Sequence, residues 1–252
     1  MSSLNFYLWI IYSKMKKLAI VIPCYNEQQR LKKSSILELI NHQEKVEVYL
    51  VNDGSTDRTL EFITDLSKNH EGISVINYSK NQGKAKTIYK SFLELSKLKK
   101  ITHFGYLDAD FSTESKDFLK MHQVLLNSDK EYIFGSRILT LNTQIYRKTY
   151  RHFIGRIIIT FINFFFKLGI YDTQCGAKIF NRRILNSIIE KEFVTNWLFD
   201  IEIFIRLSNV KLLDVGFEYP LQKWRDVNGS KIKKIDSLYI VLDIFKLIRS
   251  YR

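Results

Sequence analysis

Two carboxylates one residue apart, Asp108 and Asp110, follow an apolar run in the segment YLDADFS at 106–112. Side chains at positions i and i+2 of an extended chain point the same way, so both carboxylates can converge on one ligand. Such oxygen-rich pairs suit Mg²⁺ or Mn²⁺, hard cations that keep several waters and bridge to substrate phosphates. Aspartate is also a common turn residue. The pair alone therefore leaves two interpretations open, a metal site or a turn that ends a strand.

Three more polar clusters also follow apolar runs: PCYNE (23–27), NDGSTD (52–57) and NQGK (81–84). The apolar runs are rich in Ile and Val, which predicts buried strands within 17–25, 46–55, 72–78 and 102–110. Helical spacing of apolar residues predicts helices at about 27–43, 57–70 and 83–97, the second capped by Ser55 or Thr56.

This alternation of strands and helices predicts an α/β fold built on a mostly parallel sheet. Ligands of such sheets bind beyond the carboxyl ends of the strands, and all four polar clusters fall there. Four clusters at one edge favour a binding site over a set of unrelated turns.

Composition narrows the class of partner. The formal net charge of +13 predicts an anionic partner, which leaves nucleic acid, a phosphorylated substrate and an acidic membrane surface open. No glycine-aromatic RNA motif or helix-turn-helix pattern occurs, and acidic clusters repel phosphate in the absence of a metal. We therefore expect no nucleic-acid partner. Cys24 and Cys175, the two cysteines, suggest no metal framework and fit a reducing compartment.

The sequence contains no run of 18 uncharged apolar residues, so it predicts no transmembrane helix. The apolar stretch LNFYLWIIY lacks a basic start and a cleavage site, so residues 1–15 are expected to be an N-terminal extension, upstream of the true start if translation begins at Met15. The segments 153–170 and 231–252 have the pattern of interfacial amphipathic helices, and a core-packing role is the alternative.

Eight motifs together resemble one enzyme family: IPCYNE (22–27), VNDGSTDRT (51–59), NQGKAK (81–86), DAD (108–110), GSR (135–137), DTQCGAKIFNR (172–182), WLFDIE (197–202) and KWRDVNGSKI (223–232). Over about residues 16–252 the chain resembles the inverting family 2 glycosyltransferases. Within them it is similar to the branch of dolichyl-phosphate β-glucosyltransferases and bacterial polyprenyl-phosphate glycosyltransferases. The order DTQCGAKIF, WLFDIE, NGSK is the most restrictive part of the match.

The resemblance implies a GT-A fold, with one Rossmann-like, mostly parallel sheet flanked by helices and with C-terminal amphipathic helices. Residues 16–115 would form the nucleotide-sugar half and 116–252 the acceptor half with membrane-interfacial helices. The implied reaction transfers a hexose, glucose in this branch, from a donor such as UDP-glucose to a polyisoprenyl monophosphate with inversion. The enzyme would be cytoplasmic and peripheral, at the inner face of the membrane.

The resemblance also implies roles for individual residues. Donor-binding residues would be Pro23, Tyr25, Glu27, Asp53, Lys84, Asp108 and Ala109. Catalytic residues would be Asp110 and Arg137, with Arg137 and Lys84 near the donor phosphates, and Asp108 and Asp110 would hold Mg²⁺ or Mn²⁺. Asp172 and Asp200 are further catalytic candidates, for orienting the acceptor or a basic side chain. Related mannosyl enzymes carry Gln where this chain has Ser112, so the sequence leaves a side-chain metal contact there open.

Basic residues in and around the DTQCGAKIFNR motif are candidates for the acceptor phosphate: Arg147, Arg151, Arg156, Lys178 and Arg182, of which Arg151, Lys178 and Arg182 are the primary assignments. Trp197 and Phe204 are expected to be core residues, and Cys175 is expected to pack as a small apolar group. Asp200 lies on the same predicted helical face as Trp197 and Phe204. Because an unpaired buried carboxylate is costly, this position predicts a basic partner or a catalytic role for Asp200. The competing function is transfer to a hydroxyl acceptor in cell-surface polysaccharide synthesis.

Overall fold

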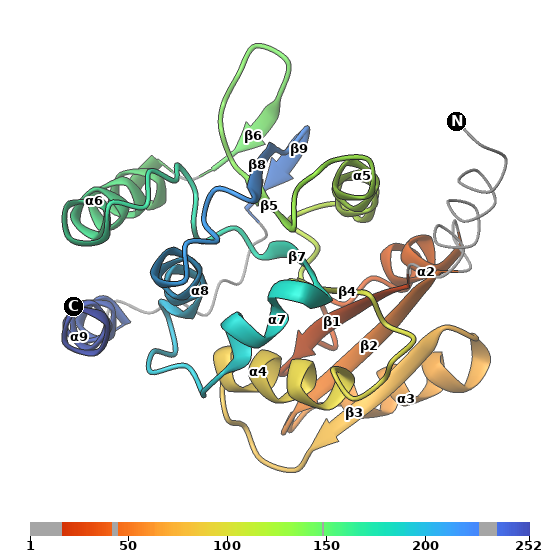
Figure 1. The fold of residues 1–252 in the computed structure, drawn as a ribbon. Helices are drawn as coiled ribbons and strands as arrows, with labels where there is room; N and C mark the ends of the chain where they lie inside the picture. Colours follow the sequence, from red (N-terminus) through yellow and green to blue (C-terminus); the bar gives the residue numbers. More distant parts are fainter. Residues whose placement is uncertain (1–16, 42–44, 148, 227–235) are drawn as a thin grey trace, which may run out of the picture.

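The computed structural model describes residues 17–41, 45–147, 149–226 and 236–252, and Figure 1 shows their fold. Within these residues a seven-stranded sheet has the order β3-β2-β1-β4-β7-β5-β8. Its strands are β1 (Leu18–Cys24), β2 (Val46–Asp53), β3 (Ile73–Tyr78), β4 (His103–Leu107), β5 (Tyr132–Ser136), β7 (Ala177–Asn181) and β8 (Gly216–Pro220). The predicted N-terminal extension at 1–15 and the start of the predicted C-terminal segment at 231–235 lie outside the described residues.

The sheet is parallel except around β7. Strand β1 pairs in parallel with β2 and β4, β2 with β3, and β5 with β8. Strand β7 runs antiparallel to both β4 and β5. The predicted mostly parallel α/β sheet is confirmed. The carboxyl ends of β1, β2, β4 and β5 therefore meet at the edge where β7 begins.

Helices cover both faces of the sheet (Figure 1). On one side lie α2 (Lys33–Asn41), α3 (Thr59–Asn69) and α5 (Ser115–Leu126), and on the other lie α4 (Lys84–Leu95), α7 (Arg182–Ile189) and α8 (Phe199–Asn209). Successive residues of β1 point to opposite faces, so Ala19 and Val21 join the core under α4, α7 and α8 whereas Ile20 and Ile22 join the core under α2, α3 and α5. Burial on both faces explains why these strands read as continuous apolar runs.

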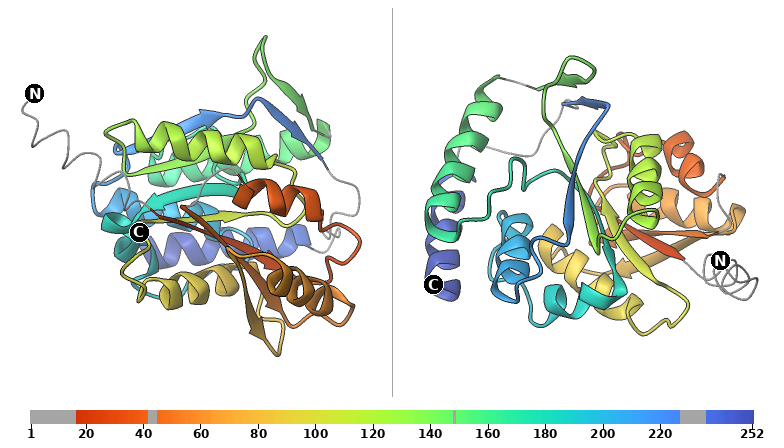
Figure 2. Two further views of the ribbon diagram at one scale, coloured as in Figure 1. Left: turned by 90° about the vertical axis from the view of Figure 1, so that its right-hand side faces the viewer. Right: turned by 45° about the horizontal axis from the view of Figure 1, so that its top comes forward.

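Two long helices, α6 (Thr149–Phe166) and α9 (Asp236–Tyr251), form an outer layer beside α8 (Figure 2). Their ends meet where Arg252 Cζ lies 5.2 Å from the centre of the Phe165 ring. The Tyr251 hydroxyl donates to Glu202 Oε1 of α8 at 2.7 Å, and Arg206 Nε donates to that hydroxyl at 2.9 Å. Among the described residues, no helix has the length and apolar character needed to cross a bilayer.

A small parallel ribbon of β6 (Gln144–Tyr146) and β9 (Lys223–Arg225) projects beyond the sheet at the top of Figure 1. Its Trp224 makes an isolated bridge to Thr113, which follows the Asp108–Asp110 pair, and the centre of the Trp224 ring lies 5.1 Å from Arg137 Cζ, directly after β5. The ribbon thus borders the edge at which the polar clusters gather.

One predicted helix start and one predicted helix cap are wrong. The helix expected at 27–43 begins at Lys33, because Asn26 has a positive φ of 51° and Glu27 O accepts the N–H groups of Arg30 and Leu31 in a tight turn. The helix expected at 57–70 begins at Thr59, and its first N–H is bound by Asp57 Oδ1 at 2.9 Å rather than by Ser55 or Thr56.

Gly54, in the loop after β2, makes the closest backbone approach at this edge. Its φ is +66°, and a Cβ there would lie 2.4 Å from the backbone N of Asn81. Gly169 has a similar φ of +67° but open space around the same position. An alanine at either position would strain the backbone, but only at Gly54 would it also clash with neighbouring atoms.

We expect Gly54→Ala to lower the free energy of unfolding by more than about 2 kcal/mol, since strain and clash add. Gly169→Ala, the matched control, should lower it by about 1 kcal/mol, the strain alone. Urea unfolding of both variants at pH 7 measures the difference. Equal losses would contradict the close approach of the two loops.

Candidate active site

Strand register brings the predicted site residues to one edge of the sheet. Leu107 of β4 pairs with Ala177 of β7, so Asp108 lies beside Gly176, and the Asp108 N–H donates to Gly176 O at 3.0 Å. A Cβ on Gly176 would lie 1.9 Å from Asp108 Oδ2. The Asp108 carboxylate therefore rests directly on the backbone of the DTQCGAK loop, a contact that glycine alone permits.

Lys84, the first residue of α4, forms an ion pair with this carboxylate, with 2.6 Å between its Nζ and Asp108 Oδ1. Burial raises the pKa of Asp108 above its ordinary value; the Lys84 charge opposes this rise and the Asp110 charge adds to it. For Lys84, burial lowers the pKa, but the charges of Asp108 and Asp200 outweigh burial and the net shift is upward. Lys84 is thus a fixed cation, at a helix end that disfavours cations unless an anion is near.

Asp110 is partly exposed, and its Oδ1 accepts the Ser112 N–H at 2.9 Å in a local turn. Phe111 between them has a φ of 51°, in the left-handed region. Ala109 is buried. Both interpretations of the pair thus have support, since Asp110 shapes a turn and also presents a carboxylate beside Asp108. Among the described residues, no group of three or more His, Cys, Asp or Glu side chains is arranged to hold a metal ion by itself.

Asp53 holds the loop that positions Lys84. Its two carboxylate oxygens accept the backbone N–H groups of Gln82 at 3.0 Å and Gly83 at 2.9 Å, and the residue is buried. Since Gly83 directly precedes α4, this contact fixes where the helix begins. The predicted contact of Asp53 with the donor base and ribose stays a prediction, and the geometry adds a role that the sequence did not reveal.

The PCYNE cluster lies at the end of β1. Pro23 pairs in register with Val51, and both Pro23 and Tyr25 are partly exposed. Glu27 is buried, and its Oε2 accepts from Arg30 Nε at 2.6 Å. The donor-binding roles of Pro23, Tyr25 and Glu27 remain predictions.

A second ion pair lies at the end of β5, where the Arg137 guanidinium forms two hydrogen bonds with the Asp172 carboxylate. Arg137 Nε donates to Asp172 Oδ2 at 2.6 Å and Nη2 to Oδ1 at 2.7 Å. Glu218 holds the same loop by accepting the Asp172 N–H at 2.8 Å. Burial raises the pKa of Asp172, but the Arg137 charge and hydrogen bonds outweigh it and the net shift is downward. A carboxylate kept ionised in this way is a weak proton acceptor, so Asp172 is better suited to orient Arg137 than to act as a base.

Arg147 and Arg156 gather around the same loop. Arg156 Nη1 donates to Tyr171 O at 3.2 Å, and its Cζ lies 4.3 Å from the centre of the Tyr171 ring. Burial lowers the pKa of Arg147, and the nearby charge of Arg137 lowers it further. Arg137 and Arg147 therefore act on the Asp172 carboxylate, and Arg156 binds the backbone of the residue before it, so three guanidinium groups lie around this loop against the two carboxylates of Asp172 and Glu218.

The structure corrects two of the three primary assignments for the acceptor phosphate. Arg182 lies at the opposite end of β4, where its guanidinium donates to the carbonyl oxygens of Ser96, Leu98 and Ile101. Lys178 is completely buried, so it cannot contact an acceptor directly. The Arg151 side chain lies outside the described residues.

Asp200, in the first turn of α8, has the basic partner that its burial predicted. Lys178 Nζ lies 2.5 Å from Asp200 Oδ1, and the Tyr106 hydroxyl donates to the same oxygen. Phe204 and Cys175 are fully buried, as predicted. Trp197 is not a core residue: 36% of it is exposed, because α8 begins only at Phe199 and Trp197 precedes the helix.

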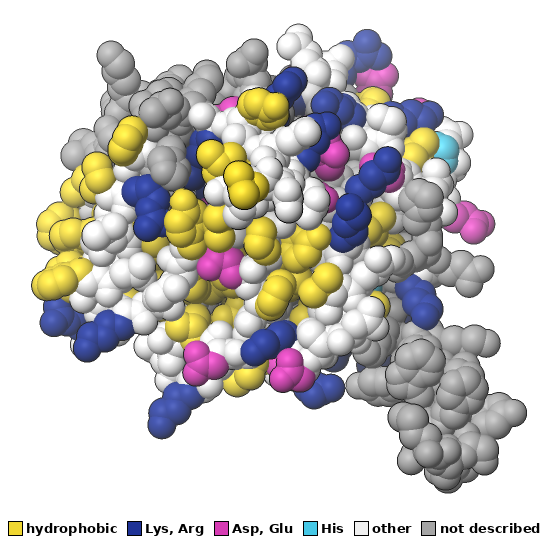
Figure 3. All heavy atoms as spheres, turned by 90° about the horizontal axis from the view of Figure 1, so that it is seen from above, with side chains coloured by type: hydrophobic (Ala, Val, Ile, Leu, Met, Phe, Trp, Pro, Cys, Tyr) yellow, Lys and Arg dark blue, Asp and Glu magenta, His cyan; other side chains and the backbone are white. Residues whose placement is uncertain are grey.

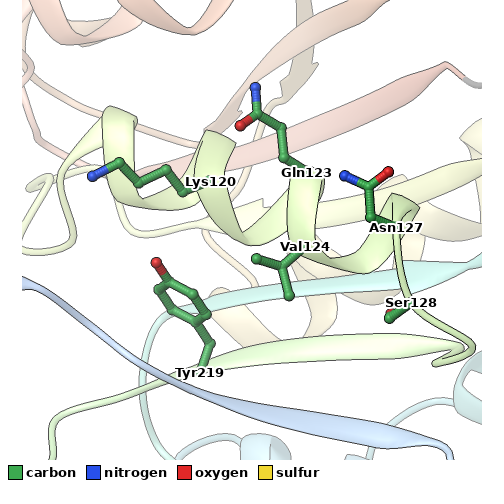
Figure 4. Close-up of a pocket in the computed structure, with 6 residues that line it drawn as sticks. All are labelled: Lys120, Gln123, Val124, Asn127, Ser128 and Tyr219. Carbon is green, nitrogen blue, oxygen red and sulfur yellow. The ribbon is translucent and has the colours of Figure 1, made fainter.

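Sequence reasoning missed Tyr106 and Gly176. Tyr106 stands two residues before Asp108 on the strand, and the alternation of strand side chains could have placed both on the α4 side. A separate shallow pocket lies between α5 and β8 (Figure 4). None of the predicted site residues lines it, so the chemistry that the sequence indicates lies elsewhere.

The Arg137–Asp172 pair makes a pH-dependent contribution to stability. Because the folded pKa of Asp172 is lowered, the stabilisation is complete well above the ordinary Asp pKa of about 4 and is lost as the pH falls below that value. Asp172→Asn should lower the free energy of unfolding by about 3 kcal/mol at pH 7. Urea unfolding of the variant and the wild type should show this difference shrinking by about 1 kcal/mol between pH 5 and pH 3. A difference independent of pH would contradict the ion pair.

Comparison with known proteins gives concordant matches. The family model described as Glycosyl transferase family 2 matches residues 19–189. A dolichyl-phosphate beta-glucosyltransferase of Saccharomyces cerevisiae is 30% identical over 93% of this chain and 75% of the relative. Another of that name, from Trichomonas vaginalis, is 27% identical over 93% of this chain and 74% of the relative.

Among solved structures, glucosyl-3-phosphoglycerate synthase from Mycobacterium tuberculosis, in complex with Mn²⁺, UDP and glucosyl-3-phosphoglycerate, has a TM-score of 0.70. The match covers 94% of this chain and 80% of that chain at 15% identity, which shows a shared fold. The family model spans more than half of the chain, and the yeast relative agrees with it. The chain belongs to glycosyltransferase family 2.

Proposed function

We propose that the protein transfers glucose from UDP-glucose to a polyisoprenyl monophosphate of the dolichyl type, with inversion, to give a β-linked lipid-phosphate sugar. The observation that carries the proposal is the apposition of two unlike charge clusters across Gly176. The acidic cluster of Asp108 and Asp110 lies on one side, and the arginine cluster of Arg137, Arg147 and Arg156 is anchored to the same loop. The names of the relatives support glucose and dolichyl phosphate as substrates.

The acidic cluster suits a nucleotide diphosphate sugar. The residues present fit a hard divalent cation, Mg²⁺ or Mn²⁺, because Asp108 and Asp110 would supply carboxylate oxygens, the ligands that such cations prefer. When bound, the cation stabilises negative charge on the leaving diphosphate. Lys84, fixed by Asp53 through the Gly83 turn, adds a second positive charge beside the same phosphates.

The arginine cluster suits a phosphate monoester, which arginine binds with parallel hydrogen bonds. The second pKa of a phosphate monoester is about 6, so its attacking oxygen is mostly anionic at neutral pH and needs no strong base. That oxygen forms a bond to C1 of glucose while the bond from C1 to the UDP oxygen breaks, and UDP leaves with the electron pair. In-line attack inverts the configuration at C1. The protein neutralises charge and aligns the two substrates.

A hydroxyl acceptor would need a true general base. Asp172 and Asp200, the candidate carboxylates, are each engaged by a cation, Arg137 and Lys178. This pairing favours the phosphate acceptor over the polysaccharide alternative. Parallel assays with a polyprenyl phosphate and with an oligosaccharide acceptor separate the two, since the alternative predicts transfer to a sugar hydroxyl.

The outer faces of α6 and α9 suit a membrane surface. Exposed apolar side chains recur along α6 at Phe153, Ile157, Phe161 and Phe164, and along α9 at Val241, Leu242 and Phe245. Figure 3 shows hydrophobic side chains gathered on the side of the molecule where α6 lies. Their number and alignment support the interfacial interpretation over core packing. We propose that the enzyme is peripheral, on the cytoplasmic face of the membrane, where it meets its lipid acceptor.

Asp110→Asn should reduce transfer from UDP-glucose to a polyprenyl phosphate at least about 100-fold, because it removes a carboxylate oxygen from the proposed cation site. Asp129→Asn, a matched change in an exposed turn, should leave transfer unchanged. Both are measured in saturating Mg²⁺ or Mn²⁺, and circular dichroism checks the fold. Near wild-type turnover in the Asp110 variant would refute the assigned role.

The triple change Ile157→Asp, Phe164→Asp and Phe245→Asp should weaken binding to phosphatidylglycerol vesicles more than about tenfold, since each side chain contributes about 1.5 kcal/mol or more when buried in lipid. Activity on a short, water-soluble prenyl phosphate should persist. The control is Leu93→Asp with Val210→Asp, two exposed apolar positions outside α6 and α9. Equal vesicle co-sedimentation of the triple variant and the wild type would rule out this surface.

A further inference from the structure

Two lysine ammonium groups lie close to one buried aromatic ring beneath the end of β4. Lys84 Nζ is 5.6 Å from the centre of the Tyr106 ring, and Lys178 Nζ is 5.3 Å from the same centre. Tyr106 and Lys178 are completely buried, whereas Lys84 is partly exposed at the site. The centre of one ring therefore lies within 5.6 Å of both a lysine of the site and a lysine of the protein interior.

Asp200 is the carboxylate that interacts with both of these lysines. Its Oδ1 receives hydrogen bonds from Lys178 Nζ at 2.5 Å and from the Tyr106 hydroxyl. Lys178 Nζ also donates to Cys175 O at 2.8 Å, so the ammonium is held on two sides. Asp108 and Asp200 both act on Lys84 through their charges. They are thus competing carboxylates for Lys84, and Lys178 engages one of them.

We propose that Lys178 is a positioning residue for the donor: by pairing with Asp200, it leaves Lys84 to Asp108 and to the donor diphosphate. The proposal rests on the proposed function, because it assigns Lys84 to the phosphates of UDP-glucose. It replaces the predicted contact of Lys178 with the acceptor, which complete burial excludes.

The physical reason lies in the high free energy of an unpaired charge in a low-dielectric interior. Without Lys178, Asp200 would keep the Tyr106 hydroxyl but lose its compensating cation. Lys84 lies on the same ring and would relieve that charge by turning from Asp108 toward Asp200. Donor affinity should then fall, although the substituted side chain touches no ligand.

The test is a double-mutant cycle on donor binding, read by isothermal titration with UDP-glucose in the presence of Mn²⁺. Lys178→Met should weaken binding about tenfold, within the range of couplings found inside one charge network. Adding Asp200→Asn to Lys178→Met removes the competing charge and should restore the affinity to within about threefold of wild type. Lys178→Gln, which keeps a donor for Asp200, takes the place of the methionine variant if the latter fails to fold, and should act in the same direction.

Arg206→Met is the matched control, because Arg206 forms a similarly buried pair with Glu202, 2.6 Å away on α8. It should lower the melting temperature and leave UDP-glucose affinity unchanged at a temperature where the variant is folded. Unchanged affinity in the folded Lys178 variant, or an equal loss with and without Asp200→Asn, would overturn the inference alone. Absence of UDP-glucose binding by the wild-type protein would overturn the proposed function and the inference together.

Discussion

The contact between the Asp108 carboxylate and the backbone of Gly176 is the constraint on which the site depends. It exists because β7 runs antiparallel between β4 and β5, so the loop before β7 and the chain after β4 leave the sheet at the same place. The carboxylate occupies the space that any larger residue at 176 would fill. This one reversed strand brings the loop that contains Gly176 onto the carboxyl ends of β1, β2 and β4.

The acidic residues near the site differ in the groups that they bind. Asp108, Asp172 and Asp200 each have a cation, respectively Lys84, Arg137 and Lys178. Asp53 instead binds backbone N–H groups and so fixes the start of α4. A net charge of +13 alone suggests a uniformly basic surface, whereas the fold places three buried or half-buried ion pairs near one edge of the sheet. The chemistry follows from which charges are paired with one another and which are left to face a substrate.

The sequence predicted β1 to β4 because these strands read as apolar runs that alternate with helices, and it predicted the position of Asp108 and Asp110 because both follow such a run. It did not predict β5, β7 or β8, so the antiparallel strand that shapes the site was missed. It could not predict the roles of Lys178 and Arg182. Both lie within a strongly recognisable motif, but Lys178 is buried in the core and Arg182 lies at the far end of β4, facts that depend on strand pairing. The prediction that Trp197 is a core residue is wrong for a local reason: it assumed that Trp197 lies in a helix, but α8 begins two residues later, at Phe199. Distance along the chain from a motif is a poor guide to distance from the site.

The most direct test of the central claim is the identity of the bond that the wild-type protein makes. Purified protein is incubated with UDP-glucose, Mn²⁺ and a polyprenyl phosphate, and the anomeric configuration of the product is determined by NMR. The apposition of an acidic donor cluster and an arginine acceptor cluster predicts a β-linked glucosyl phosphate. Transfer to a hydroxyl group with none to the phosphate, or an α-linked product, would contradict the account.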